Sequence, residues 1–318
     1  MASCRHFIIG VIAIQCLGMV LYEILFVTNN KQEKRKYVGF HLNYGGLGNQ
    51  LFHLITGYGI ARTLTRIHYL PCEKPRSYVL KQLQKIEEAF PLLRNTYVLS
   101  PNGTKESITP FAGSCCAYDN PRRLLSESAE HLLLNFIYGQ NPRYFDEYLP
   151  EIRNLLRFSD KVRREGRYIM DTLQIHDARM LCIHIRMTDF VWLNVSTNAN
   201  DTVSAANAIA KQQGISRFMI FGDDQNFIHR LAKTIVKDGN WKTDAVVASN
   251  FNEVTDLYLA SQVCQSFLIT AATSTFGWWL AFFIKDQNAV FYMQDNRRHA
   301  DKVPSKELFL TSWRQYSR

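Results

Sequence analysis

The sequence lacks several features that define other classes of protein. Seven cysteines in 318 residues are too few for a disulfide-stapled scaffold, and no repeat of about 20–50 residues indicates a solenoid or a propeller. It contains no Cys-x-x-Cys pair and no Asp-x-Asp step, so neither a zinc site nor a common metal–nucleotide spacing is predicted. Hydrophobic residues make up 47% and charged residues 20%, which excludes wholesale disorder. What remains is a globular chain of one to three domains.

The formal net charge is +9. Such a charge favours an anionic partner, whether nucleic acid, a membrane surface or a nucleotide phosphate, and does not choose among them. No basic run with interleaved aromatic residues appears in the chain, so no nucleic-acid partner is expected.

One long apolar run stands at the start of the chain. Residues 7–27 contain only Gln15 and Glu23 as strongly polar groups, and they match the ~20 residues with which a helix crosses ~30 Å of hydrocarbon. No convincing cleavage site follows, so we expect an uncleaved transmembrane signal anchor, with a cytoplasmic tail at 1–6 and a short stem at 28–36. A cleaved signal peptide is the alternative.

The signals for membrane orientation disagree. Four basic residues follow the apolar run and Arg5 precedes it, which by the positive-inside rule favours a cytosolic protein body. Three glycosylation sequons favour the lumen instead, at Asn102, Asn194 and Asn200. Five cysteines follow the run and leave disulfides open in an oxidising lumen. Of these, Cys182 and Cys264 have the surroundings of small buried hydrophobic residues.

Beyond residue 36, short apolar strands alternate with amphipathic helices, which is typical of βαβ units and a parallel sheet. The expected strands are 37–42, 180–185, 217–221, 245–247, 267–270 and 289–292. The expected helices are 49–66, 151–173, 202–213, 226–237, 253–263 and 275–284. The alternation is regular only from residue 180, so we expect an N-terminal α/β domain over 37–150 and a C-terminal one over 151–318. Ligands of such sheets bind beyond the carboxyl ends of the strands.

The loop after the first expected strand is rich in glycine. Gly45, Gly46 and Gly48 allow close backbone approach, and the helix that opens at Asn49 and Gln50 presents free N–H groups to a phosphate or carboxylate. The loop is neither a Walker A sequence nor Gly-x-Gly-x-x-Gly. A plain tight turn into a helix explains it equally well.

A second polar group follows the strand 180–185. Alternation along an extended strand would put His184, Arg186 and Thr188 on one face. Arg186 suits bidentate phosphate binding, while a structural pair with Asp189 is the alternative.

Two further polar loops follow later strands. Asp223 and Asp224 lie after the strand 217–221. The pair suits ligand binding, and the alternative is that Asp224 caps the next helix. Ser274 and Thr275 lead into a helix with Trp278 and Trp279. The hydroxyl groups suit a helix cap or an oxyanion, and the tryptophans suit core packing. The four loops together describe a site for a phosphate-rich ligand, with no obvious metal.

These motifs, in this order, resemble the α-1,2-fucosyltransferase family. Gly45–Phe52 matches its N-terminal signature, and the other matches are His184–Phe190, Phe221–Asp224 and Ser274–Trp279. The resemblance implies a GT-B-like fold, in which two Rossmann-like domains face a cleft with the donor on the C-terminal side and the acceptor on the N-terminal side. It also implies inverting transfer of L-fucose from GDP-β-L-fucose to the 2-hydroxyl of a terminal galactose on a glycan, without cofactor or metal, by a single-pass type II Golgi membrane protein with a lumenal catalytic part.

The resemblance also assigns roles to the site residues. Arg186 binds the diphosphate together with the glycine loop, Ser274 and Thr275, and His184 orients the site. Asp223 or Asp224 holds guanine or ribose, and Asp189 is either the catalytic base or a partner that fixes Arg186. One departure is Met187, where the family usually has a second arginine. It keeps two alternatives open, namely an inactive glycan- or nucleotide-sugar-binding relative and a transferase with another donor or acceptor.

Overall fold

The computed structural model describes residues 35–71, 77–101, 103–176 and 179–317. The described residues from Lys36 onward form one compact unit. The predicted tail, the predicted anchor at 7–27, Cys72 and the sequon residue Asn102 lie outside the described residues. Among the helices that are described, none combines the length and the apolar character needed to cross a bilayer.

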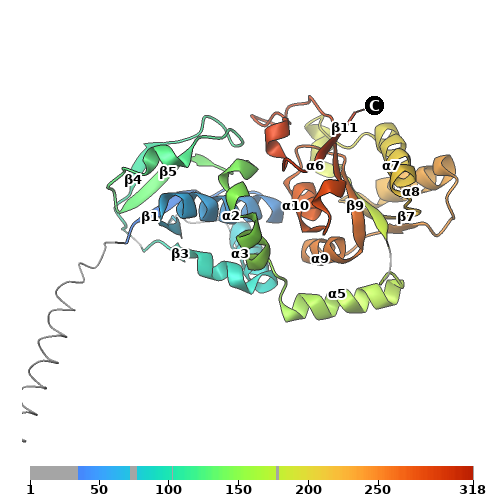
Figure 1. Ribbon diagram of the computed structural model, residues 1–318, viewed down its shortest axis with the longest axis horizontal. Coiled ribbons are helices and arrows are strands. Elements are labelled where there is room, and N and C mark those ends of the chain that lie inside the picture. The colour runs from blue at the N-terminus through green and yellow to red at the C-terminus, as the bar shows by residue number, and fades with distance from the viewer. Residues whose placement is uncertain (1–34, 72–76, 102, 177–178, 318) are drawn as a thin grey trace, which may run out of the picture. The chain divides into compact units, whose positions relative to one another are not determined.

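The first half of the described chain builds a parallel sheet with strand order β3-β2-β1-β5-β4, and Figure 1 labels β1, β3, β4 and β5 of this sheet. Its strands are β1 (Tyr37–His41), β2 (Ile67–Leu70), β3 (Tyr97–Leu99), β4 (Ser107–Pro110) and β5 (His131–Ile137). Helices α2 (Leu47–Leu64) and α3 (Ser77–Ala89) belong to this half. Apolar side chains of β1 and β5 are buried side by side, with Val38 paired to Leu132.

The second half builds a longer parallel sheet with strand order β11-β10-β9-β6-β7-β8. Its strands are β6 (Met180–His184), β7 (Arg217–Phe221), β8 (Val246–Ala248), β9 (Cys264–Ile269), β10 (Val290–Met293) and β11 (Arg314–Tyr316). Its helices are α6 (Thr188–Trp192), α7 (Ala199–Gln213), α8 (Gln225–Gly239), α9 (Glu253–Val263) and α10 (Thr275–Phe283). All five residues of β6 are buried, as expected for an apolar strand covered on both faces.

The predicted α/β fold with parallel strands is confirmed, and the expected strands of the second half recur within three residues of their predicted bounds. The continuous helix predicted over 151–173 is wrong. Helix α4 (Leu149–Leu155) ends early and α5 (Asp160–Leu173) begins afresh, lying along α9 in Figure 1. The break has a local cause, because the Ser159 side chain accepts a hydrogen bond from the Val162 N–H and caps α5.

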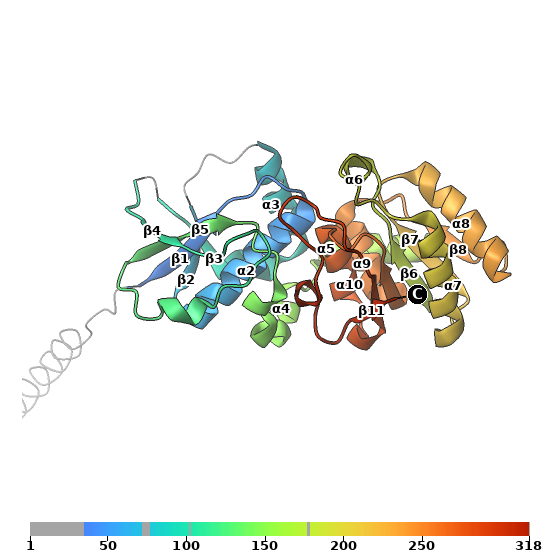
Figure 2. The ribbon, with the colours of Figure 1, turned by 90° about the horizontal axis from the view of Figure 1, so that it is seen from above.

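The two sheets share one apolar core. Helix α2 packs against α10 (Figure 2), and the ring of Phe52 lies 4.9 Å from that of Trp278 and 5.1 Å from that of Trp279. Trp279 also donates from Nε1 to the Gly48 carbonyl at 3.0 Å. The predicted core role of both tryptophans is therefore confirmed, and the domain boundary near residue 150 stays a prediction.

Two disulfides occur in the described chain. One joins Cys182 of β6 to Cys264 of β9, two neighbouring strands of the second sheet. Both cysteines are buried, as the sequence predicted. The prediction treated them as small hydrophobic residues and did not include the covalent bond between them. The other disulfide joins the adjacent residues Cys115 and Cys116.

Candidate active site

A cavity of about 670 Å³ opens where strands of both sheets end. Its walls come from the loops that follow β1, β5, β6, β7, β8 and β9, and from the chain after β10. Ten of the twelve residues predicted for the donor and catalytic site line it, and Gln50 and Asp224 do not. The structure therefore brings together four motifs that are separated by up to about 230 residues of sequence.

The glycine loop is held in shape from within. Gln50 is buried, and its Nε2 donates to Asn43 Oδ1 at 2.9 Å and to the Gly45 carbonyl at 3.1 Å. Asn43 Oδ1 also accepts from the Gly45 N–H at 3.0 Å. Gln50 thus supports the loop, while Gly45 and Gly46 line the cavity.

The start of α2 lies against the start of α10. A Cβ atom on Gly48 would sit 2.7 Å from the Phe276 nitrogen and 2.9 Å from the Thr275 carbonyl carbon. Only glycine allows this approach without a backbone shift. Asn49 Oδ1 adds a direct link, because it accepts from Thr275 Oγ1 at 3.1 Å and from Gln140 Nε2 at 2.7 Å.

Arg186 stands between two carboxylates. Its guanidinium lies 2.8 Å from Asp189 and 3.1 Å from Asp223, and its side chain remains 32% exposed at the cavity wall. Asp223 also accepts from the Met187 N–H at 2.8 Å and from the Thr188 hydroxyl at 2.5 Å. The predicted Arg186–Asp189 pair is present, and the same arginine faces the cavity.

The predicted common face of His184, Arg186 and Thr188 is wrong. Strand β6 ends at His184, and Thr188 is already the first residue of α6, so strand alternation does not extend that far. Thr188 instead reaches the same carboxylate as Arg186 because the chain turns between them.

His184 is fully buried at the floor of the cavity, and no described group bonds its Nδ1 atom. Burial, assisted by the positive charge of Arg186, lowers the pKa of His184 to about 3. The ring is therefore neutral at physiological pH, and it packs edge-on against Phe276.

The helix-cap interpretations of Asp224 and Ser274 are confirmed. Asp224 Oδ1 accepts from the Phe227 N–H at 2.9 Å and caps α8. Ser274 Oγ accepts from the Gly277 N–H at 3.4 Å and caps α10. Ser274 also lines the cavity, whereas Asp224 does not.

The cavity contains residues that sequence reasoning missed, among them Lys302 and Asp256. Lys302 is buried, and its Nζ donates to Gln140 Oε1 and to the Thr273 carbonyl, each at 3.0 Å. Burial lowers the pKa of Lys302 to about 7. Asp256 is buried on α9 and accepts from the Ser249 hydroxyl, and burial raises the pKa of Asp256 to about 7. Neither residue lies at the carboxyl end of a predicted strand, so no pattern marked them.

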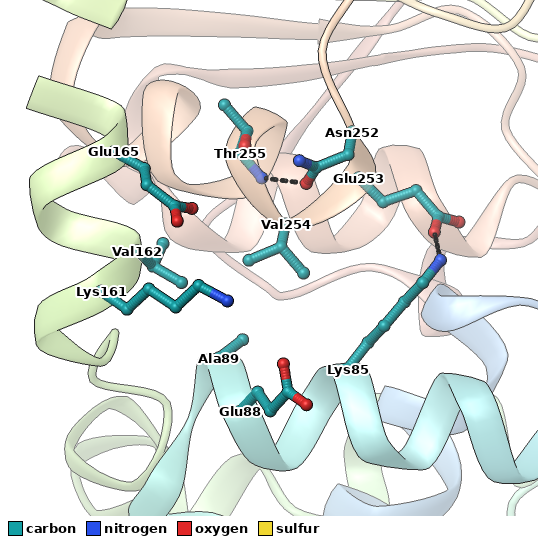
Figure 3. A pocket seen from close by; sticks show the side chains of 10 residues that line it. All are labelled: Lys85, Glu88, Ala89, Lys161, Val162, Glu165, Asn252, Glu253, Val254 and Thr255. Atoms are coloured by element: carbon teal, nitrogen blue, oxygen red, sulfur yellow. Dashed lines mark hydrogen bonds and ion pairs between the residues drawn. The ribbon is translucent and has the colours of Figure 1, made fainter. Parts of the chain in front are cut away.

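A smaller cavity of about 290 Å³ lies among α3, α5 and α9 (Figure 3). Lys85 forms an ion pair with Glu253 at 3.2 Å on one side, and Lys161 and Glu165 project from α5 on the other. It contains none of the residues predicted for the site. The larger cavity is therefore the candidate active site.

Two parallel sheets that share a polar cavity at their carboxyl strand ends define an α/β enzyme with a ligand site between sheets. Within the described ranges, no cluster of three or more His, Cys, Asp or Glu side chains is arranged to hold a metal ion. The family model described as Glycosyl transferase family 11 matches residues 127–316. The chain belongs to this family and is a glycosyltransferase, which confirms the resemblance found in its motifs.

Named relatives and a solved structure agree with this family. A galactoside 2-alpha-L-fucosyltransferase of Caenorhabditis elegans is 28% identical over 300 residues, which cover 86% of this chain and 74% of the relative. A second protein of that name from the same organism is 27% identical over 306 residues, covering 91% and 82%. The fold is similar to the crystal structure of POFUT1 in complex with GDP-fucose, with a TM-score of 0.53 and 12% identity over 79% of this chain and 94% of that one.

Proposed function

We propose that the chain is an inverting fucosyltransferase that moves L-fucose from GDP-β-L-fucose to the 2-hydroxyl of a terminal galactose. The observation that carries the proposal is the convergence of ten predicted residues on one cavity. Its volume of about 670 Å³ lies within the range of about 300–1,000 Å³ typical of small-molecule sites. The names of the two nematode relatives support the donor sugar and the linkage.

In this mechanism the leaving diphosphate is stabilised by fixed donors. As the bond between fucose C1 and the β-phosphate oxygen breaks, its electron pair stays on the phosphate. In this proposal Arg186 and the positive end of the α10 dipole stabilise that charge, since Arg186, Ser274 and Thr275 line the cavity and α10 begins at Thr275. Thr275 and the glycine loop also line the cavity.

The acceptor hydroxyl attacks C1 from the opposite face, and its proton goes to a carboxylate. Asp189 has the role of this base, since its side chain is 56% exposed at the cavity. Its carboxylate lies 2.8 Å from the Arg186 guanidinium, which holds it at the cavity wall. Asp223 is less exposed, at 18%, and holds Arg186 and the turn that follows β6.

The two sheets correspond in this proposal to the two halves of a GT-B-like enzyme. The second sheet carries the donor side through Arg186, Asp223 and Ser274. The first sheet carries the acceptor side together with the glycine loop.

The test is a transfer assay with the full chain in detergent. GDP-fucose is supplied with a panel of galactose-terminated glycans, and the linkage of each product is determined. We expect α-1,2-linked fucose, with activity unchanged by EDTA. Transfer from another nucleotide sugar, or a different linkage, would replace the specificity proposed here. Binding of GDP-fucose without transfer or hydrolysis would instead identify an inactive relative, the alternative that Met187 favours.

We also propose a type II Golgi membrane protein with a lumenal catalytic part. The apolar run at 7–27 supports an anchor. The Cys182–Cys264 disulfide supports an oxidising compartment, and the sequon residues Asn194 and Asn200 are both exposed. Glycosidase treatment of the expressed protein tests this placement. We expect the glycosidase to lower the mass of the wild type by removing its glycans. A variant in which Asn102, Asn194 and Asn200 are all changed to glutamine should show no such shift. The placement is contradicted if the wild type carries no glycans and its loops are open to protease in intact vesicles.

A further inference from the structure

Two kinds of cationic side chain line the cavity. Arg186 already has carboxylates at 2.8 and 3.1 Å, so much of its charge is neutralised before any ligand arrives. Lys302 is different, because no described carboxylate lies within ion-pair distance of its ammonium group. Its bonded partners are the neutral oxygens of Gln140 and Thr273.

A buried ammonium without a counter-ion is costly to maintain. Lys302 is only 7% exposed. The nearest acid in the sequence, Asp301, uses its carboxylate to accept from the Cys115 N–H at 2.8 Å. One N–H of the ammonium remains without a described partner, and the neighbouring Thr273 hydroxyl is also buried and unbonded. Both groups belong to residues that line the cavity, and both suit an anionic ligand.

The segment that carries Lys302 is fixed in place. Lys302 and His299 exchange backbone hydrogen bonds at 2.9 and 3.0 Å. Arg297 donates to the Ser196 carbonyl at 2.9 Å and forms an ion pair with Asp295 at 2.8 Å. The ammonium is therefore preorganised at the cavity wall rather than carried on a free chain.

We propose that Lys302 is a catalytic residue that binds the donor diphosphate and supplies the positive charge that Met187 does not. The inference rests on the fucosyltransferase function proposed above. When the bond between C1 and the phosphate oxygen breaks, the electron pair moves to that oxygen and the ammonium stabilises it. The sugar C1 forms its new bond to the acceptor oxygen, and the acceptor proton goes to Asp189. Lys302 keeps its own protons throughout.

The first experiment compares GDP with guanosine, and so separates the charge of Lys302 from its contribution to the shape of the cavity. We expect K302M to weaken GDP binding at least tenfold while leaving guanosine binding within a factor of two, because only GDP carries the diphosphate. Loss of kcat should be on the order of 10². K233M, which removes an exposed lysine of α8 outside the cavity, is the matched control and should match the wild type. Equal loss of guanosine and GDP binding would mean that Lys302 only shapes the wall, and no loss of either would also overturn the inference.

The second experiment needs no variant that might fold poorly. Because burial holds the pKa of Lys302 near 7, an arriving diphosphate should raise it and draw a fraction of a proton from solution at pH 7.5. Calorimetry of GDP binding in buffers with different ionisation heats measures this uptake. The other titratable or charged groups around the cavity are His299 and Asp301 beside Lys302, with His184, Arg186, Asp189, Asp223, Glu253, Asp256, Tyr44, Tyr78 and Tyr138 on the remaining walls.

Comparison with K302Q, which retains a side chain that can bond Gln140, assigns the uptake to Lys302. Uptake that persists in K302Q contradicts the inference, and so does its absence in the wild type. The outcomes for the function are separate. A wild type that binds GDP but transfers no fucose overturns the proposed activity alone, and a wild type that binds no GDP overturns both.

Discussion

At the scale of single residues, the charges around Arg186 limit what the cavity can bind. The arginine is shared between Asp189 and Asp223, and a guanidinium has enough N–H groups to hold both and still face a ligand. Removal of the arginine would leave two neighbouring carboxylates facing an anionic donor. The residue therefore affects both the affinity and the chemical step.

We expect Arg186→Ala to lower kcat/KM with GDP-fucose by about 10²–10³, the usual cost of losing a donor that stabilises developing charge. R186K should recover part of the loss, because it restores charge without the bidentate geometry. R164A, at an exposed arginine of α5, is the control. Turnover of Arg186→Ala close to that of the wild type would remove Arg186 from the mechanism.

Three buried histidines give the fold a dependence on pH. Burial holds the pKa of His53 well below its ordinary value and lowers those of His68 and His184 to about 3. The unfolded chain titrates its histidines near ~6.5, so below that pH the unfolded state binds more protons than the native state. His68 and His184 then each remove about 1.4 kcal/mol of stability per pH unit as the pH falls from ~6.5 toward about 3, and His53 acts in the same direction.

The measurement is urea unfolding at pH 7.5 and pH 5.5. Asp256 acts in the opposite direction, because its raised pKa favours the native state in acid. The contribution of one histidine is therefore taken from a variant. Between pH 7.5 and pH 5.5, His68→Leu should lose less stability than the wild type. The control His229→Gln, at an exposed site on α8, should lose as much stability as the wild type. An unchanged pH slope in His68→Leu would show that His68 is not held neutral.

At the scale of elements, the contact between α2 and α10 depends on one missing side chain. Gly48→Ala places a methyl group about 2.7 Å from the Phe276 nitrogen, which is backbone and cannot rotate away. We expect a loss of about 1–3 kcal/mol, the usual cost of overpacking, with weaker GDP binding. Gly113→Ala, at an exposed position with no neighbouring atom within 4 Å, should stay within about 0.5 kcal/mol. Equal stability of the two variants in urea would disprove the tight docking.

The second sheet was largely predictable because its central strands β6, β7 and β9 are almost fully buried. β6 and β7 appear in the sequence as continuous apolar runs, which a parallel sheet requires. The first sheet was predictable only at β1. Its edge strand β4 has no fully buried residue and includes Ser107 and Pro110, so it carries neither an apolar run nor a clean alternation.

The candidate site divides in a similar way. Arg186, Asp223 and Ser274 could be predicted because polar residues directly after apolar strands are placed by the sheet itself. Lys302 and Gln140 lie in segments without periodicity, and tertiary contacts alone bring their side chains together. Sequence spacing carries no information about such a contact.

At the scale of the whole molecule, the two sheets should unfold together. A single buried cluster extends from Val38 of β1 to Trp313 near the C-terminus. Domains that share a large apolar interface have little freedom to separate. We expect hydrogen exchange in β1 and β5 to require the same opening free energy as exchange in β6 and β9, within about 1 kcal/mol. Exchange of the first sheet at much lower free energy would establish an independent unit.

The docking of α2 on α10 has a consequence for how the glycine signature is interpreted across distant sequences. Gly48 lines the cavity, and the backbone of Thr275 and Phe276 already fills the space that a Cβ atom would need there. An enzyme that evolves toward another donor or acceptor must still pack α2 against α10, so we expect the glycine to persist through changes of substrate. The signature therefore marks the architecture of the contact between α2 and α10, whereas Met187 and Lys302 lie on neither helix and can change with the ligand.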